Sequence, residues 1–432
     1  MLYNFYRILG TICYPLLVLT SPLCERFAPH WQLARRFARY PALNSRRLIW
    51  IHAASVGEVQ AARALIAVLR DALPETDFFF TAMTRQGKAV ARSLLPASVR
   101  CEPAPLDIPR VVSKAINLLQ PSLYICLETE LWPVMLTKMR QAGVPMLLLN
   151  GRISERSFLQ YQRIQKTVAQ LLAGFAAVGV IREQDGERFH CLGVPADRIQ
   201  VCGNMKYDLI SHKHELKANK DYARLLDIQP DDILFLCGST RTGEEKLLLP
   251  VYARLRETLS DRKSKLLWLI APRHIERLPE VRTLLNRAGL EYELFSQCAA
   301  GKKRQANIIL LDSMGELARL YAAGHYIFCG GSLVDKGGHN IMEPVAQGKP
   351  VFFGPFMQDF QDAVELVVSA GAGVQVHSPD ELAERLLNSS LDSATYKQAC
   401  QAAGRLARTQ QGAAKRQADM VLQVLASRGR TF

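Results

Sequence analysis

A glutamate at the junction of a predicted strand and a predicted helix is the first candidate for chemistry in this chain. Leu48 to Ile51 is an apolar, β-favouring run, and Val59 to Leu69 has the periodicity of a helix. Glu58 lies between them, so its carboxylate would stand in the first helical turn at the carboxyl end of a strand, where open α/β sheets bind ligands. A first-turn acid also complements the helix dipole, with a contribution of about 0.3 to 1 kcal/mol. Position alone leaves a ligand-binding role and a purely structural role open.

Polar side chains also follow other predicted strands in the first half of the chain. If the strands are parallel, all of these side chains lie with Glu58 at one edge of the sheet. Taken singly, each could be a helix cap or an exposed charge, but acids, a lysine and an arginine on one rim indicate a site. The runs are Glu128-Thr129-Glu130, Asn150-Gly151-Arg152 and Gly203-Asn204-Met205-Lys206.

The second half is rich in glycines and helix starts after its predicted strands. Glycines let a backbone approach a phosphate, and a helix that begins near Asn340 would point its free amides at that anion. Glu343, one turn in, could accept hydrogen bonds from sugar hydroxyls. The Walker and dinucleotide glycine spacings are absent, which disfavours ATP hydrolysis and hydride transfer, and purely structural turns remain the alternative. The runs are Gly238-Ser239-Thr240, Pro272-Arg273, Ser313 to Glu316, Gly330-Gly331-Ser332 and Gly337 to Pro344.

The elements that must position these residues alternate between strand and helix, as in doubly wound α/β domains. A chain of 432 residues is long enough for two such domains. We predict a first domain over 26–210, a polar linker over 211–229, a second domain over 230–405 and a C-terminal helix over 406–432 that possibly crosses back to the first domain. The predicted strands are Leu48–His52, Phe78–Ala82, Leu123–Leu127, Met146–Leu149, Ala176–Val180, Ile199–Cys202, Ile233–Cys237, Leu266–Ile270, Tyr292–Phe295, Ile308–Leu311, Tyr326–Cys329 and Val351–Phe353.

Residues 1–25 are interpreted as a membrane anchor or interfacial helix. Ile8 to Cys24 is free of charge, and arginines follow it, which favours a body in the cytoplasm. Pro15 and Pro22 weaken a spanning helix, so a buried first helix is the second interpretation and a signal peptide the third. The net charge of +14 implies an anionic partner, and in the membrane interpretations the basic stretch would face anionic head groups.

Cysteines and histidines do not form a recognisable reactive or metal-binding pattern. The ten cysteines are scattered singly, without a Cys-x-x-Cys pair, and are typical of buried thiols in a reducing compartment. His52 and His274 have no partner at a usable spacing and are interpreted as structural. No Asp-x-Asp run follows a strand, so we predict neither a metal nor a cofactor.

Five motifs together resemble those of 3-deoxy-D-manno-octulosonic acid (Kdo) transferases, membrane-associated glycosyltransferases of lipopolysaccharide biosynthesis. The resemblance spans nearly the whole chain in the expected order. It implies the GT-B architecture, two Rossmann-like domains that face an interdomain cleft, with CMP-Kdo as donor and a lipid A precursor (lipid IVA) as acceptor in the N-terminal domain. The implied location is the cytoplasmic face of the inner membrane. The motifs are His52 to Glu58, Glu128-Thr129-Glu130-Leu131-Trp132-Pro133, Asn150 to Ser154, Gly203 to Asp208, and Gly330 to Pro344.

The resemblance also implies roles for single residues. Glu58 matches the general base of an inverting transfer, and Glu128 and Lys206 match positions that support the transition state. Asp359-Phe360 departs from a pattern that often has Asn before Phe, so it receives no role. Donor binding is implied for Pro272, Arg273, Met314, Gly315, Glu316, Asn340, Ile341, Met342 and Glu343.

Two other functions compete with this one. A sugar-nucleotide 2-epimerase would share the two-domain fold and the glycine-rich nucleotide site, but it would not need an apolar N-terminus followed by arginines. A non-enzymatic basic protein that binds membranes or nucleic acid would explain the net charge of +14. It would not explain acids at successive strand ends, and the chain contains no recognisable nucleic-acid module.

Overall fold

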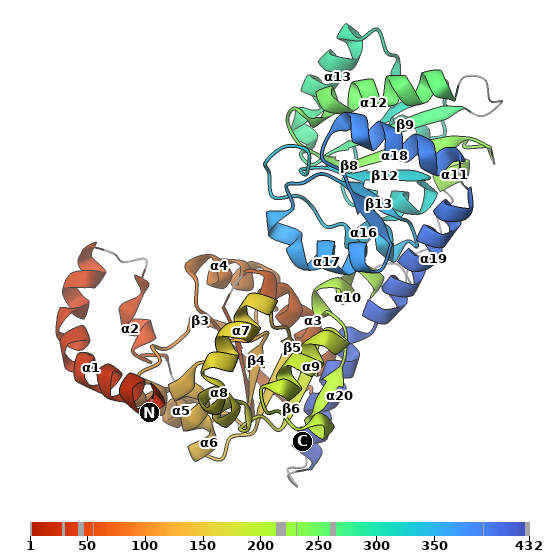
Figure 1. The fold of residues 1–432 in the computed structure, drawn as a ribbon. Helices are drawn as coiled ribbons and strands as arrows, with labels where there is room; N and C mark the ends of the chain where they lie inside the picture. Colours follow the sequence, from red (N-terminus) through yellow and green to blue (C-terminus); the bar gives the residue numbers. More distant parts are fainter. Residues whose placement is uncertain are drawn as a thin grey trace. The chain divides into compact units, whose positions relative to one another are not determined.

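The computed structural model describes residues 2–27, 31–41, 47–54, 56–212, 222–229, 231–259, 265–391 and 393–427. Residues 213–221 of the predicted linker over 211–229 lie outside the described residues. The chain divides into two compact units (Figure 1). The first contains Met1–Leu209 together with Gln410–Phe432, and the second contains Ile210–Thr409.

The first unit is built on a seven-stranded parallel sheet with the order β3-β2-β1-β4-β5-β6-β7. The order reverses between β1 and β4, which pair directly, and this reversal makes their carboxyl ends the switch point of the sheet. Every residue of β1 is buried, as expected for a strand covered on both faces. The strands are β1 (Leu48–Ala53), β2 (Asp77–Ala82), β3 (Arg100–Pro103), β4 (Leu123–Leu127), β5 (Met146–Gly151), β6 (Ala177–Val180) and β7 (Ile199–Val201).

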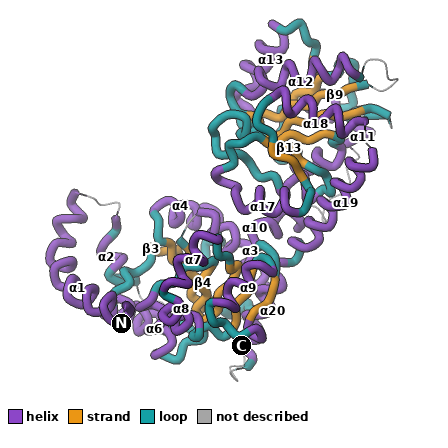
Figure 2. The backbone as a smooth tube through the Cα atoms, in the orientation of Figure 1, coloured by secondary structure: helices purple, strands orange, loops and turns teal. Residues whose placement is uncertain are grey.

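Helices cover both faces of this sheet and form two separate apolar cores (Figure 2). Alternate residues of β1 serve the two faces: Ile49 and Ile51 pack with α3 and α20, whereas Trp50 packs with α5 and α6. The helices are α2 (Leu33–Arg36), α3 (Val56–Ala72), α4 (Arg85–Leu94), α5 (Pro109–Leu119), α6 (Pro133–Gln141), α7 (Glu155–Arg163), α8 (Gln165–Leu172), α9 (Glu183–Cys191), α10 (Met205–His212) and α20 (Ala413–Ala426).

The last helix, α20, belongs to the core of the first unit although it comes from the other end of the chain. Its buried side chains, among them Val421 and Leu425, pack in the same cluster as α3. The carboxylate of Asp208 accepts hydrogen bonds from the amides of Gly412 at 2.7 Å and Ala414 at 2.8 Å, which fixes the start of α20. The C-terminal segment is therefore an integral part of the first unit.

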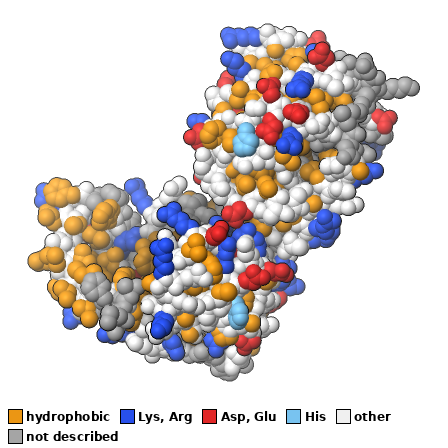
Figure 3. Space-filling view, viewed as in Figure 1, with side chains coloured by type: hydrophobic (Ala, Val, Ile, Leu, Met, Phe, Trp, Pro, Cys, Tyr) orange, Lys and Arg blue, Asp and Glu red, His pale blue; other side chains and the backbone are white. Residues whose placement is uncertain are grey.

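The first helix, α1 (Leu2–Phe27), is apolar and largely uncovered. It is the one helix in the described part of the chain that is long and apolar enough to cross a membrane, with 22 residues from Tyr6 to Phe27 and 6% of the apolar window buried. The helix continues through Pro15 and Pro22. Figure 3 shows apolar side chains gathered over α1. The exposed ones are Tyr6, Ile8, Leu9, Ile12, Leu16, Leu17, Leu19, Leu23 and Phe27.

The second unit repeats the plan with a seven-stranded parallel sheet, in the order β10-β11-β9-β8-β12-β13-β14. Its switch point lies between β8 and β12, which pair in register from Tyr326↔Phe235 to Cys329↔Gly238. The strands are β8 (Ile233–Thr240), β9 (Leu266–Pro272), β10 (Tyr292–Leu294), β11 (Ile308–Leu310), β12 (Tyr326–Cys329), β13 (Val351–Phe353) and β14 (Gly373–Gln375). The helices are α11 (Tyr222–Leu225), α12 (Glu244–Thr258), α13 (Leu278–Arg287), α14 (Phe295–Ala299), α15 (Leu317–Leu320), α16 (Met342–Ala346), α17 (Gln361–Ser369), α18 (Pro379–Leu391) and α19 (Ser393–Gln410).

A buried histidine lies on β1 below the switch point of the first unit. His52 is 2% exposed, and its Nδ1 lies 3.0 Å from Thr81 Oγ1, which also accepts a hydrogen bond from Trp50 Nε1 at 2.8 Å. Its ring stacks on Tyr124 with a centroid distance of 6.4 Å. Burial lowers the pKa of His52 to about 4, so this side chain is neutral at physiological pH.

We expect Leu425→Ala to destabilise the first unit. Leu425 is buried in the cluster shared with α3, and truncation of a buried leucine typically lowers the free energy of unfolding by about 2–5 kcal/mol. Urea denaturation followed by tryptophan fluorescence measures the change. Gln423→Ala on the exposed face of the same helix is the control, and an equal effect of both variants would contradict the packing of α20 described above.

We expect His52 to make the first unit acid-sensitive. The folded pKa of about 4 lies below the unfolded value of 6.5. The unfolded state therefore binds the extra proton first, and stability is lost as the pH falls from 6.5 to 4, by at most about 3 kcal/mol. Urea denaturation at pH 7 and pH 4.5 should show a smaller loss for His52→Gln than for the wild type. Parallel losses would show that His52 is not the source.

Candidate functional site

The switch point of the first unit places Glu58 directly after β1. Glu58 is the third residue of α3 and is 3% exposed. Its Oε2 accepts a hydrogen bond of 2.6 Å from the amide of Ala54, just before the helix. This contact resembles the reach-back half of a capping box, but the amide lies four residues before Glu58 rather than three. The structural role anticipated for a first-turn acid is thus present, and the same bond holds the carboxylate in a fixed orientation.

Glu128 and Lys206 meet at the same edge although 78 positions separate them in the sequence. Lys206 Nζ lies 2.7 Å from Glu128 Oε1, and about a sixth of each side chain is exposed. Glu128 follows β4 with φ 54°, and Asn150, the penultimate residue of β5, has φ 55°. Residues other than glycine rarely adopt this left-handed backbone, and such strain concentrates at functional sites. The parallel sheet therefore brings the predicted residues together.

A glutamine of the C-terminal helix positions the loop that directly precedes Lys206 and α10. Gln417 is fully buried; its Oε1 accepts the amide hydrogen of Asn150 at 2.6 Å, and its Nε2 donates to Gly203 O at 3.1 Å. Asn150 Oδ1 in turn accepts the amide hydrogen of Met205 at 2.9 Å. Gln417 was not predicted as a site residue, because the expected return of the C-terminal helix to the first domain does not indicate which of its side chains reaches this edge.

Acidic groups dominate the space around the β4 end. The pKa of the Cys126 thiol is raised well above its usual value, first by burial and then by the nearby carboxylates of Glu130 and Glu58. Burial also raises the pKa of Glu130, while the hydrogen bond from Trp132 Nε1 at 3.1 Å opposes the rise. Glu58 and Glu130 therefore lie close enough to the same thiol to act on it, which confirms that the two strand ends converge.

In the second unit, Pro272 ends β9 beside the switch point, and Arg273 follows it. The amide of Arg273 donates to Thr240 O at 3.0 Å, so the ends of β8 and β9 are joined, and the Arg273 side chain is exposed. Burial raises the pKa of Glu343, and the guanidinium of Arg273 opposes that rise. Arg273 and Glu343 are therefore near each other, as donor binding by both would require.

The remaining predicted donor residues are less uniform. The helix expected near Asn340 begins at Met342, is five residues long, and has its first amide bound by Asn340 Oδ1 at 3.1 Å. Ile341 and Met342 are buried in the core, so any ligand contact there would involve their backbone. After β11, Met314 is 78% exposed. Gly315 has φ 81°, and Glu316 Oε2 accepts a hydrogen bond of 2.5 Å from the hydroxyl of Tyr222.

One buried carboxylate holds the glycine-rich loop of this unit together. Glu244, the first residue of α12, is fully buried and accepts four backbone hydrogen bonds. A Cβ on Gly330 would lie 2.6 Å from Thr240 Cα, so only glycine allows the loops after β8 and β12 to pack this closely. The four donors are the amides of Arg241 at 2.8 Å, Gly331 at 2.6 Å, Ser332 at 3.0 Å and Leu333 at 2.9 Å.

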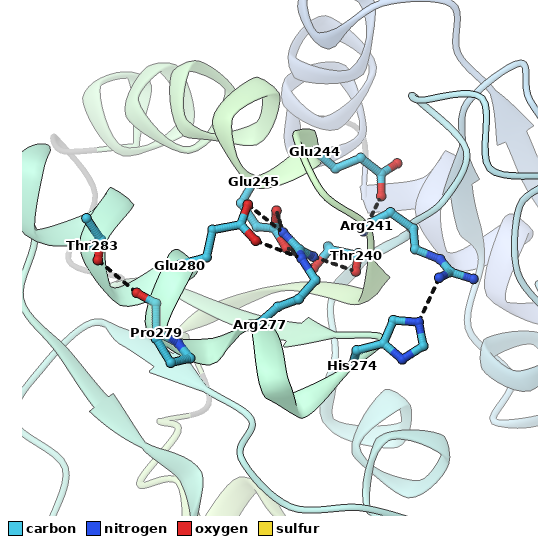
Figure 4. Close-up of polar contacts among 9 residues, drawn as sticks. All are labelled: Thr240, Arg241, Glu244, Glu245, His274, Arg277, Pro279, Glu280 and Thr283. Atoms are coloured by element: carbon cyan, nitrogen blue, oxygen red, sulfur yellow. Dashed lines mark hydrogen bonds and ion pairs between the residues drawn. The ribbon is translucent and has the colours of Figure 1, made fainter.

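Arg241 is the clearest residue that the sequence analysis did not single out. Its Nη1 donates to His274 Nε2 at 2.8 Å (Figure 4), and its Nε donates to His339 Nε2 at 3.1 Å. His274, which was predicted to be structural, contacts the side chain of Arg241. The sequence contained a signal for this contact. Arg241 directly follows the Gly238-Ser239-Thr240 run, and His339 lies within the Gly337 to Pro344 run.

Known proteins share this architecture. A UDP-GlcNAc 2-epimerase from Neisseria meningitidis matches with a TM-score of 0.53 at 14% sequence identity, over 87% of this chain and all of that chain. A putative UDP-N-acetylglucosamine 2-epimerase from Listeria monocytogenes gives 0.52 at 14%, over 90% of this chain and 98% of that one. These similarities show the fold alone. They confirm the predicted GT-B fold class of two parallel-sheet α/β domains, to which the structure adds one apolar N-terminal helix.

Sequence similarity separates the transferase prediction from the epimerase alternative. A family model described as 3-deoxy-D-manno-octulosonic-acid transferase (kdotransferase) matches residues 31–209. A 3-deoxy-D-manno-octulosonic acid transferase of Haemophilus influenzae is 33% identical over 396 residues, 90% of each chain. One from Bordetella pertussis is 31% identical over 362 residues, 82% of this chain and 81% of the relative. The chain belongs to the family of 3-deoxy-D-manno-octulosonic acid transferases.

Proposed function

We propose that this transferase moves Kdo from CMP-Kdo to a lipid A precursor, lipid IVA, with inversion at the anomeric carbon. The observation that carries the proposal is the convergence of Glu58 with the Glu128–Lys206 ion pair at the switch point of the first unit. The acceptor hydroxyl oxygen attacks the anomeric carbon, and its proton passes to Glu58. The bond from that carbon to the phosphate oxygen breaks, and CMP leaves with the electron pair. No second carboxylate is needed, because the leaving group is already a stabilised phosphate.

The orientation of Glu58 supports its assignment as the base. A base must present an oxygen at hydrogen-bonding distance from the proton that it removes. The hydrogen bond from Ala54 to Oε2 fixes the carboxylate. Lys206 holds Glu128 as an ion pair at 2.7 Å, and in our proposal this pair stabilises charge that develops in the transition state.

The second unit offers a cation for the donor, and the proposed reaction uses no metal. Arg273 stands exposed at the end of β9 and can meet the charge that develops on the leaving phosphate. Glu343, whose pKa burial raises, can hydrogen-bond a sugar hydroxyl. The backbone around Asn340 and Met314 completes the proposed donor site.

Two pockets of the first unit fit an acceptor that is both apolar and anionic. One, of about 620 Å³, is lined by apolar residues of α1 and its surroundings, including Leu9, Leu17 and Trp31. The other, of about 520 Å³, is lined by Arg35, Lys88 and Arg92, with Glu25, Gln32 and Glu102. Acyl chains suit the first and phosphate groups the second. With the exposed apolar face of α1, they support a site of action at the cytoplasmic face of the inner membrane.

We expect Glu58→Gln to retain CMP binding but to lose transfer by a factor on the order of 100 to 10,000, as for removal of a general base. Glutamine can still accept the hydrogen bond from Ala54, so the fold should persist. Mass spectrometry of products formed from CMP-Kdo and tetraacylated lipid A precursor measures the transfer and also tests both substrates. Wild-type turnover in the variant would remove Glu58 from the mechanism.

We expect Arg273→Ala to weaken CMP binding by about 1.5–3 kcal/mol, the contribution of a charge-assisted hydrogen bond. The side chain is exposed, so the substitution should leave the melting temperature nearly unchanged. Calorimetric titration of the purified full chain with CMP measures the effect. An affinity equal to that of the wild type would exclude contact between Arg273 and the phosphate.

A further inference from the structure

Arg241 stands at the ligand edge of the second unit, one residue beyond β8. β8 is the central strand of its sheet, and its end adjoins both β9 and β12. The residue is half-buried, so its stem is covered while its guanidinium reaches the surface. In Figure 4 the guanidinium points away from the core network of Glu245 and Arg277 and toward His274. Ligands of open α/β sheets bind in this crevice.

Two histidines hold the guanidinium as hydrogen-bond acceptors. An arginine can only donate, so Nε2 of His339 and Nε2 of His274 both carry a lone pair where they face Arg241. Burial lowers the pKa of His339 to about 4, and Arg273 and Arg241 add to the lowering. The contacts use Nε and Nη1. In the described part of the chain, no hydrogen bond of Nη2 and no carboxylate within ion-pair distance of Arg241 is found.

Buried hydrogen bonds and close packing hold the loops around Arg241. Its amide is one of the four bound by the buried carboxylate of Glu244. Arg277 donates to Glu245 through two bonds of 2.9 Å, and Glu245 accepts a bond of 2.6 Å from the hydroxyl of Thr240. A Cβ on Gly331 would lie 3.0 Å from the His339 ring, so this glycine makes room for the supporting histidine. The guanidinium is therefore held in place before any ligand arrives.

We propose that Arg241 binds an oxyanion of the donor, with His339 and His274 as positioning residues. The inference rests on the proposed function, because it assigns a second cation to the same donor site as Arg273. Two neutral acceptors orient the planar guanidinium without neutralising its charge, whereas a carboxylate in their place would compete with the ligand. A positive charge that the protein orients but leaves unneutralised at this crevice matches an anionic ligand. CMP-Kdo carries two such groups, the phosphate and the sugar carboxylate.

Titration of the purified full chain with cytidine, CMP and CMP-Kdo tests the assignment. If Arg241 contacts the phosphate, Arg241→Gln should bind CMP about 10- to 150-fold more weakly, with unchanged affinity for cytidine. If it contacts the carboxylate, CMP affinity should stay unchanged and only CMP-Kdo should bind more weakly. Arg241→Lys, which keeps the charge but cannot reach both histidines, should fall between the wild type and Arg241→Gln. Equal affinities of the wild type and Arg241→Gln for all three ligands would overturn the proposal.

The role of His339 is tested separately. His339→Gln retains a side-chain acceptor for Arg241, whereas His339→Leu does not. We expect the leucine variant to lose affinity for the same ligand as Arg241→Gln and the glutamine variant to recover most of it. Equal losses in both variants would exclude a role as hydrogen-bond acceptor.

Two controls keep these outcomes distinct. Arg287→Gln removes an exposed positive charge from the last turn of α13 and should leave all affinities unchanged. Melting temperatures of all variants report whether the loops remain folded. If the wild type binds neither CMP nor CMP-Kdo, the proposed donor is wrong and the assignment of Arg241 fails with it. If the wild type binds and Arg241→Gln binds equally well, only the assignment of Arg241 fails.

Discussion

Parallel strand pairing is the constraint on which both candidate sites depend. Because all strands of a parallel sheet end at one edge, residues that directly follow different strands become neighbours whatever their distance in sequence. In the first unit, β1 and β4 are neighbours, and the chain continues from them to opposite sides of the sheet. Glu58 follows β1, and Glu128 follows β4. In the second, β8 and β12 do the same, and Arg241 and Gly330 follow them. Each unit thus has a crevice whose lining is set by the one or two residues after each strand.

The two edges are kept in shape by backbone hydrogen bonds to buried side chains. Gln417 binds one amide and one carbonyl in the first unit, and Glu244 binds four amides in the second. A buried polar group without partners is costly, so these side chains favour the loop positions that satisfy their hydrogen bonds. The strained backbone of Glu128 and Asn150 is sustained in the same way, by the packing and hydrogen bonds around it.

Most strands and the common edge of the site residues could be predicted from the sequence. The features that could not be predicted have physical reasons. All twelve predicted strands are present, because apolar runs between helical segments are distinctive in parallel sheets. The short edge strands β3 and β14 were missed, since Arg100–Pro103 and Gly373–Gln375 have little apolar character. The expectation that Lys206 and Glu128 share one edge followed from their positions after predicted parallel strands, and the structure places them in an ion pair. The roles of Gln417 and Glu244 depend on long-range packing, which no local pattern reveals.

The charge of each edge fits a different substrate. In the first unit, Lys206 is paired with Glu128, and the carboxylates of Glu58 and Glu130 act on the same thiol, an environment that suits acceptance of a proton. In the second unit, the carboxylate of Glu244 is bound by amides, and burial raises the pKa of Glu343. The guanidinium groups of Arg241 and Arg273 contribute positive charge to this crevice. In the proposed reaction, a donor with two anionic groups would be attracted to the second edge and disfavoured at the first, where the neutral acceptor hydroxyl would approach Glu58. In this proposal, the local charge of the two edges would direct the donor and the acceptor to different units before any specific contact forms.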